Sequence, residues 1–117
     1  MALVNREPRE ELLPTLEAMV DDPVARDVKV ILPDVLARYG SEGEPALLRL
    51  LQDSWWEVRN NAVLSLKEMG TVHAVRPLEV LRRSDPELFV RENAAEAIQA
   101  IQAIGIRSLD RSVTNED

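Results

Sequence analysis

The chain has 117 residues, of which 45% are hydrophobic and only 3% aromatic, and its formal net charge is -7 at pH 7. This length suits one domain with a core of Leu, Ile, Val, Ala and Met, a composition that favours helices over sheets. The acidic charge argues against nucleic acid as a partner, and the absence of cysteine excludes disulfides, thiolate nucleophiles and Cys-ligated zinc.

Apolar residues recur at spacings of three and four along most of the chain, which predicts six helices. We place them at residues 9–20, 24–39, 44–52, 55–69, 72–83 and 86–104. Residues 1–8 form an N-terminal segment, and residues 106–117 lose the periodicity, which predicts a flexible C-terminal tail. There is no apolar signal segment and no apolar run long enough to span a membrane, so we expect a cytoplasmic protein without membrane contact.

Capping residues mark the predicted helix ends. Asp22-Pro23 and Asp85-Pro86 are typical of an N-cap followed by proline, Ser54–Glu57 has the spacing of a capping box, and Thr71 is a further candidate cap. All four glycines follow apolar-periodic segments, where a left-handed C-cap is expected. These glycines are Gly40, Gly43, Gly70 and Gly105.

The second helix of each helix pair repeats along the sequence. Residues 28–40 align without a gap on residues 58–70, and residues 90–98 form a third copy. A repeat of this length is typical of a solenoid, in which each helical hairpin buries its apolar face by stacking on its neighbours. We therefore predict an all-α solenoid of three antiparallel hairpins, with repeats at about residues 9–40, 44–70 and 72–105.

The middle hairpin has the most detailed pattern: a Leu-Leu pair, an aspartate in the turn, a Val-Arg pair, and then Ala, Leu and a closing Gly. The residues are Leu50-Leu51, Asp53, Val58-Arg59, Ala62, Leu66 and Gly70. Over about residues 9–105 the chain resembles the HEAT-like repeat of the phycobilisome lyase type. The resemblance implies an armadillo- or HEAT-like superhelix that acts as a non-catalytic adaptor or as an assembly or regulatory scaffold for a protein or peptide partner.

The resemblance also implies roles for individual residues. Arg59 and Arg91, with Lys29 in the first copy, would have a structural role, bracing the turn or carboxylates of neighbouring repeats. Pro14 and Pro33 depart from the pattern, because each falls inside a predicted helix and must either kink it or shift its start. An alternative implied by the resemblance is a small accessory subunit similar to phycobilin lyases, although such subunits are much longer and usually act as pairs.

We find no constellation of residues that points to catalysis. His73 is the single histidine, so zinc sites that need several His or Cys ligands cannot be assembled. Carboxylates are scattered rather than paired in tuned pockets, and the isolated glycines form no phosphate-binding loop. The sequence therefore predicts a protein that is not an enzyme and has no metal or cofactor.

Aromatic residues gather where second helices begin. Trp55 and Trp56 open the second helix of the middle hairpin, and Phe89 lies in the same turn of the third, so we expect one apolar edge strip that anchors a partner. A lid folded over the turn is the alternative for both tryptophans. Asparagine amides on the concave side are suited to binding an extended peptide backbone. The predicted partner-binding residues are Trp55, Trp56, Glu57, Asn60, Asn61, Leu64, Leu88, Phe89, Glu92 and Asn93.

The last predicted helix has an apolar arc that is wide for a helix at the end of a solenoid. Ala97, Ile101 and Ile104 lie on this arc. We expect a homodimer or a partner subunit to bind there, and the alternative is that the fifth helix covers the arc.

Overall fold

The computed structural model describes the backbone of residues 8–22 and 26–115, and the side chains of residues 8–22 and 26–104. All regular structure in these ranges is helical, which confirms the predicted all-α solenoid. The α-helices are α1 (Leu13–Met19), α2 (Arg26–Ala37), α3 (Glu44–Leu50), α4 (Trp56–Met69), α5 (Val75–Ser84) and α6 (Leu88–Asn115). Short 3-10 helices at Glu10–Leu12, Gly40–Glu42 and Val72–Ala74 precede α1, α3 and α5.

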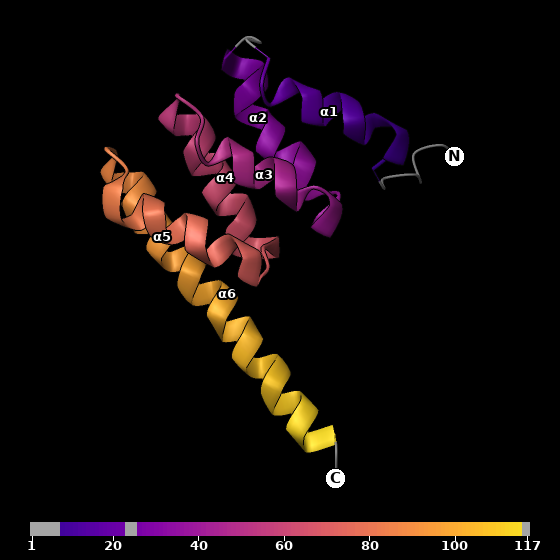
Figure 1. Ribbon diagram of the computed structural model, residues 1–117, viewed down its shortest axis with the longest axis vertical. Coiled ribbons are helices and arrows are strands. Elements are labelled where there is room, and N and C mark those ends of the chain that lie inside the picture. Colours follow the sequence, from indigo (N-terminus) through magenta and orange to yellow (C-terminus); the bar gives the residue numbers. More distant parts are fainter. Residues whose placement is uncertain (1–7, 23–25, 116–117) are drawn as a thin grey trace.

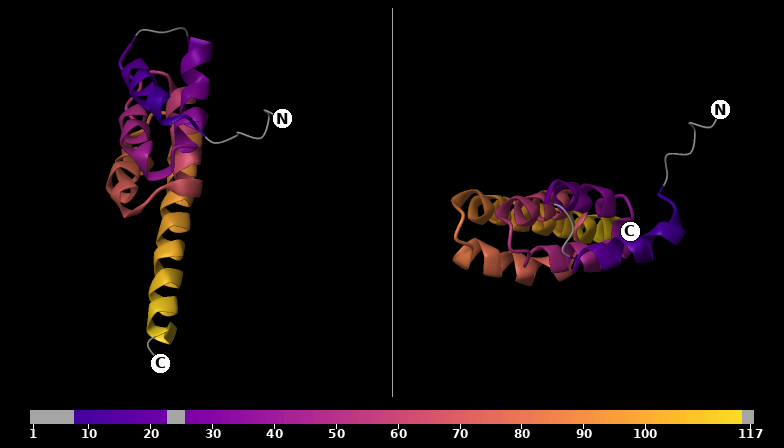
Figure 2. Two further views of the ribbon diagram at one scale, coloured as in Figure 1. Left: turned by 90° about the vertical axis from the view of Figure 1, so that its right-hand side faces the viewer. Right: turned by 90° about the horizontal axis from the view of Figure 1, so that it is seen from above.

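The helices lie in two layers. Figure 1 and the right-hand view of Figure 2 show α1, α3 and α5 in one layer and α2, α4 and α6 in the other. Within the second layer, α4 contacts both α2 and α6. The principal extents are 53 × 45 × 20 Å, and the shortest one matches two helix layers, since packed helices lie about 8–10 Å apart. We refer to α2, α4 and α6 as the second row and to α1, α3 and α5 as the first row.

An aliphatic core fills the space between the two rows. In α4 the fully buried residues return to one face every three or four positions, as an amphipathic helix requires. They are Val58, Ala62, Val63 and Leu66. Leucines of α3 and α5 and small or branched residues of α6 complete the same cluster. The core thus runs through all three hairpins, so each hairpin depends on its neighbour to bury its apolar side.

Two prolines interrupt the helical pattern of the first hairpin. Pro14 lies in the first turn of α1, and the predicted helix at 9–20 is divided there into a 3-10 helix and α1. Pro33 is buried inside α2, where it removes one backbone hydrogen bond. The predicted cap at Asp22-Pro23 lies partly outside the described residues.

Aspartates in the turns before α4 and α6 bind backbone N–H groups just ahead of these helices. The predicted capping box at Ser54–Glu57 is wrong: the Asp53 carboxylate instead accepts a hydrogen bond from the backbone N–H of Trp55 at 3.0 Å. Asp85 acts in the same way, because its Oδ1 accepts from the N–H of Glu87 at 3.0 Å. An aspartate at this place in the turn can therefore satisfy a backbone donor before the helix begins.

The glycines meet two different requirements. Of the described glycines only Gly40 has a positive φ, at 61°, so the predicted left-handed conformation is confirmed there and is wrong at Gly43 and Gly70. Space is what excludes a side chain at these two positions. A Cβ at Gly43 would lie 2.1 Å from a carbonyl oxygen of α2, and a Cβ at Gly70 would lie 2.6 Å from one of α4.

The last helix is longer than expected. α6 continues to Asn115, past the predicted end at residue 104, so residues 106–115 are helical where we expected a flexible tail. Gly105 lies within α6 and does not cap it. A single glycine inside a helix costs roughly 1 kcal/mol relative to alanine, which is too little to end a helix by itself. In Figures 1 and 2 the C-terminal part of α6 projects beyond the other helices.

Candidate functional site

The three hairpins meet at two junctions, and equivalent positions make contacts at both. The first junction joins the hairpins of α2 and α4, and the second joins those of α4 and α6. A shift of 30 residues leads from the first hairpin to the second and a shift of 32 to the third, as Val28, Val58 and Val90 illustrate. In this register three contacts recur: one in the turn, one where the second-row helices begin, and one a turn further along them.

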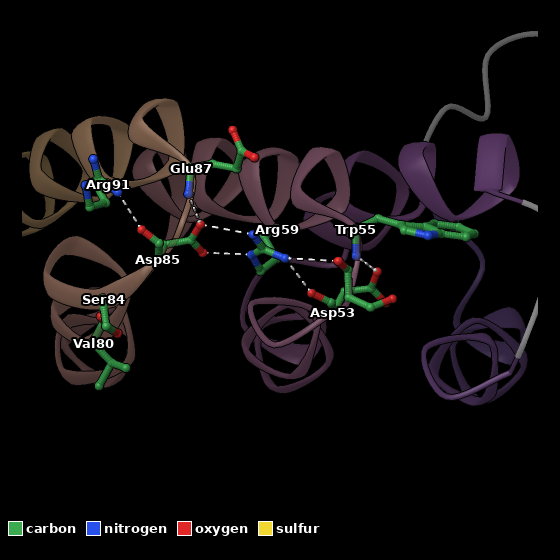
Figure 3. A network of polar contacts seen from close by, with 9 residues as sticks. Asp53, Trp55, Arg59, Val80, Ser84, Asp85, Glu87 and Arg91 are labelled. Atoms are coloured by element: carbon green, nitrogen blue, oxygen red, sulfur yellow. Dashed lines mark hydrogen bonds and ion pairs between the residues drawn. The ribbon is translucent and has the colours of Figure 1, made fainter.

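In the turn, a basic side chain binds an aspartate of the next hairpin. At the first junction Lys29 Nζ lies 2.6 Å from Asp53 Oδ1. At the second, Arg59 is bidentate, with Nε and Nη2 at 2.7 and 3.0 Å from the two carboxylate oxygens of Asp85 (Figure 3). Arg59 and Arg91 also donate to carbonyl oxygens of their own turns, those of Asp53 at 2.9 Å and Asp85 at 2.7 Å. These contacts agree with the predicted bracing role of the basic residues.

The ion pair of the second junction is buried. The Asp85 side chain is 1% exposed and that of Arg59 is 11% exposed. The pKa of Arg59 is raised, mainly by its hydrogen bond to Asp85, so the guanidinium stays charged. Two buried charges are tolerated when hydrogen bonds also satisfy their remaining polar atoms, as the N–H of Glu87 does for Asp85.

The contact at the start of the second-row helices differs between the junctions. At the first, Arg26 forms an ion pair with Glu57 and lies 5.3 Å from the ring centroid of Trp55. The hydrogen bond from Arg26 is also the main cause that lowers the pKa of Glu57. At the second junction the equivalent positions are Trp56 and Phe89, whose rings stack with centroids 6.3 Å apart. Two of the three residues expected in the aromatic strip, Trp56 and Phe89, therefore contact each other and join two hairpins, whereas Trp55 contacts Arg26 at the first junction.

The third contact uses asparagine amides. Asn61 Nδ2 donates to the carbonyl oxygen of Val30 at 2.9 Å across the first junction. At the second, Asn93 Nδ2 donates to the side-chain oxygen of Asn60 at 2.8 Å. These two amide groups already donate to neighbouring helices, so they offer less to an extended peptide backbone than we expected.

A buried carboxylate joins the second and third hairpins through the first row. Glu44 begins α3 and is buried, and its carboxylate accepts hydrogen bonds from the backbone N–H of Thr71 at 2.9 Å and from its hydroxyl at 3.0 Å. The same hydroxyl oxygen accepts from the N–H of His73 at 3.2 Å, which confirms Thr71 as a cap. Its several hydrogen bonds allow the Glu44 carboxylate to be buried without a cation.

Four of the ten predicted partner-binding residues are exposed, and the other six are partly buried. Leu64, Leu88 and Phe89 are exposed, and so is Glu92. Trp55 and Trp56 are half-buried and pack against the core. Each tryptophan therefore both covers the core and presents some surface.

A groove between α2 and α4 was missed by the sequence analysis. It has a volume of about 340 Å³, and both apolar and acidic side chains line it. The lining residues are Val30, Ile31, Asp34, Asn61, Leu64, Ser65 and Glu68. A second hollow, which shares Val30 and Ile31 with it, continues to Arg26, Asp27 and Glu57. Together they form a continuous depression along the second row, which we call the α2–α4 groove.

The apolar arc of α6 is mostly used inside the chain. Ala97 is 0% and Ile101 6% exposed, so neither is available to the interface that we expected them to form. Contacts with α5 and α4 bury this face of the helix, as the alternative interpretation requires. Only Ile104 of the three is exposed, at 50%.

Within the described residues, no group of three His, Cys, Asp or Glu side chains is placed to bind a metal ion. His73 is exposed and lies beside the cap at Thr71. None of the helices described here has the length and apolar character needed to cross a membrane. The pKa values of Arg26 and Arg59 are raised and that of Glu57 is lowered by the ion pairs that these residues form at the junctions.

The family of the chain follows from comparison with known protein families. Residues 26–99 match the model of a family described as HEAT repeats. The match is to HEAT repeats in general and does not confirm the narrower phycobilisome lyase type. No curated protein matches the chain significantly.

Proposed function

Because this chain belongs to the HEAT-repeat family, we propose that it is a non-catalytic protein-interaction module whose partner binds across the second row. HEAT repeats commonly act as scaffolds for protein interactions, through the extended surface that their stacked helices create. The observation that carries the proposal is the α2–α4 groove, in which Ile31 and Leu64 are 58% and 40% exposed. Large apolar side chains exposed beside one another are typical of interaction sites.

The apolar surface continues from this groove toward the third hairpin. The groove reaches Glu57, and the neighbouring Trp56 stacks on the exposed Phe89. The first row also has an apolar hollow, but it is smaller and confined to α3 and α5. A partner on the second row would therefore contact all three hairpins, whereas a partner on the first-row hollow would contact only two.

Site-specific photo-crosslinking in the native host tests this proposal. A benzophenone amino acid at Leu64 should form an adduct with a partner protein, and the same substitution at Val80, exposed on the first row, provides the matched control. The partner is identified by mass spectrometry, and its affinity is then measured with purified proteins. An adduct that forms from position 80 and not from position 64 would contradict binding through the second row.

A further inference from the structure

The charges of the second row indicate the chemistry of its partner, and this inference rests on the function proposed above. Within α2, α4 and the described part of α6, the carboxylates are Asp27, Asp34, Glu57, Glu68, Glu92 and Glu96. The basic residues of the same segments are Arg26, Lys29, Arg59, Lys67 and Arg91. The two sets are similar in number, so the charge that a partner meets depends on which of these groups are already paired within the chain.

Each basic side chain of these segments binds another group of the chain. Lys29, Arg59 and Arg91 bind the turns of the solenoid. The two remaining cations are each paired, Arg26 with Glu57 and Lys67 with Glu96. All five basic side chains of these second-row segments therefore take part in contacts within the chain.

Four second-row carboxylates form no ion pair with any described side chain. They are Asp27, Asp34, Glu68 and Glu92, and all four are exposed. Arg38, which follows α2, is also exposed and is not within ion-pair distance of them. Asp34 and Glu68 line the α2–α4 groove on opposite helices, beside the exposed Ile31 and Leu64. The groove thus combines exposed apolar side chains with one carboxylate from each of its two helices.

We propose that the α2–α4 groove binds a cationic amphipathic helix of a partner protein. An apolar side chain of that helix would lie between Ile31 and Leu64, and flanking lysines or arginines would reach Asp34 and Glu68. A helix suits this groove better than an extended strand, because a helix satisfies its own backbone hydrogen bonds. The amide of Asn61, which an extended segment would need, already donates to Val30. The unpaired carboxylates would attract such a partner and repel an acidic one.

Two designed peptides test this charge assignment on the full chain. One is a short amphipathic helix of leucine and lysine, and the other has glutamate at every lysine position. Each is titrated into the isotope-labelled protein, and backbone amide shifts are followed by NMR at low and physiological salt. The lysine peptide should move the amide signals of α2 and α4 around the groove, and its affinity should fall as salt screens the charges.

A double variant, Asp34→Asn with Glu68→Gln, removes the charge of both groove carboxylates while keeping side-chain shape. Its affinity for the lysine peptide should fall by about fivefold or more, since two exposed charge interactions are lost. The control is Glu10→Gln with Glu11→Gln, which removes the same charge from exposed positions in the first 3-10 helix. Circular dichroism and thermal unfolding verify that both variants remain folded.

Three results would overturn the proposal: equal binding of the two peptides, equal weakening by the groove variant and its control, or shifts confined to helices other than α2 and α4. The proposed function can fail separately. If a partner is crosslinked from position 64 but the lysine peptide does not bind the groove, the second row remains the proposed binding surface and the charge assignment is wrong. If the lysine peptide binds the groove but a partner is crosslinked from position 80 and not from position 64, the charge assignment stands and the proposed function is wrong.

Discussion

The two junctions of this solenoid use the same positions and different chemistry. At the first junction a lysine forms an ion pair with the turn aspartate, whereas at the second junction an arginine binds the aspartate with two hydrogen bonds. The first junction has the Arg26–Glu57 ion pair where the second has the stacked rings of Trp56 and Phe89. The comparison shows that the repeat preserves which positions meet and leaves the type of contact free to vary. Because the second junction is more buried and more aromatic, we expect it to open less often than the first.

The largest expected effect is that of Asp85→Asn, which removes the charge of the buried carboxylate. The guanidinium of Arg59 would then remain buried and charged without a carboxylate partner, which lowers the free energy of unfolding by about 3–5 kcal/mol. Asparagine still caps a helix, so the change isolates the ion pair. Chemical denaturation measures the loss. The equivalent variant at the first junction, Asp53→Asn, should lose only about 1–3 kcal/mol, because a single lysine contact is broken. Equal losses would contradict the difference between the junctions.

The next effect concerns Glu44, which adds a contact to the second junction through the first row. In Glu44→Gln one of the two oxygens that accept from Thr71 becomes an amide donor. Unfolding free energy should fall by about 1.5–3 kcal/mol, since a hydrogen bond to a charged group is lost in a buried site. The control is Glu42→Gln, an exposed position in the preceding turn, which should change stability little. A similar loss in both variants would show that the effect is one of net charge.

A smaller effect is expected for the aromatic pair. A double-mutant cycle with Trp56→Leu and Phe89→Leu isolates the interaction between the two rings from the burial of each side chain. The coupling energy should be about 0.5–1.5 kcal/mol, the range found for aromatic pairs. Thermal unfolding of the four proteins supplies the measurement. No coupling would mean that the rings are neighbours without stabilising the junction.

The smallest effect should be the pH dependence of the Arg26–Glu57 contact. Arg26 lowers the pKa of Glu57 from its ordinary value of 4.5, so the folded state favours the ionised carboxylate. The resulting stability is fully present above pH 4.5 and is lost as the pH falls through the lower pKa of the folded protein. Hydrogen exchange of α2 amides, followed as the solution is acidified, measures the opening of the first junction. In Glu57→Gln this pH dependence should be reduced, and an unchanged profile would show that another group is responsible.

The sequence predicts much of the junctions, because the valines at 28, 58 and 90 align the second-row helices without ambiguity. That register places Trp56 and Phe89 in the same turn of neighbouring hairpins, and their rings stack. The bracing role of Arg59 was implied by the resemblance to HEAT-like repeats. The same register also places Ile31 opposite Asn61 and Asp34 opposite Leu64, so the groove residues of α2 could have been found by extending the comparison to the first hairpin.

Other features depend on contacts that a local pattern does not specify. The first-row helices align only loosely, so nothing in the sequence pairs Glu44 with Thr71. The apolar arc of α6 looks the same whether a partner or α5 covers it, and the burial of Ala97 and Ile101 depends on how the hairpin closes. Gly43 and Gly70 follow helices as caps do, but the close approach of a carbonyl oxygen is what requires glycine there.

The turn ion pairs imply a way for such a chain to lengthen. Arg59 reaches forward to Asp85, so a tandem copy of residues 53–84 inserted after Ser84 would present each arginine with an aspartate at the same distance along the chain. The copied Glu57 would meet Trp56 where Phe89 now lies, and a phenylalanine in the copy would restore the stacked rings. Growth by internal duplication would thus require one compensating substitution at this contact.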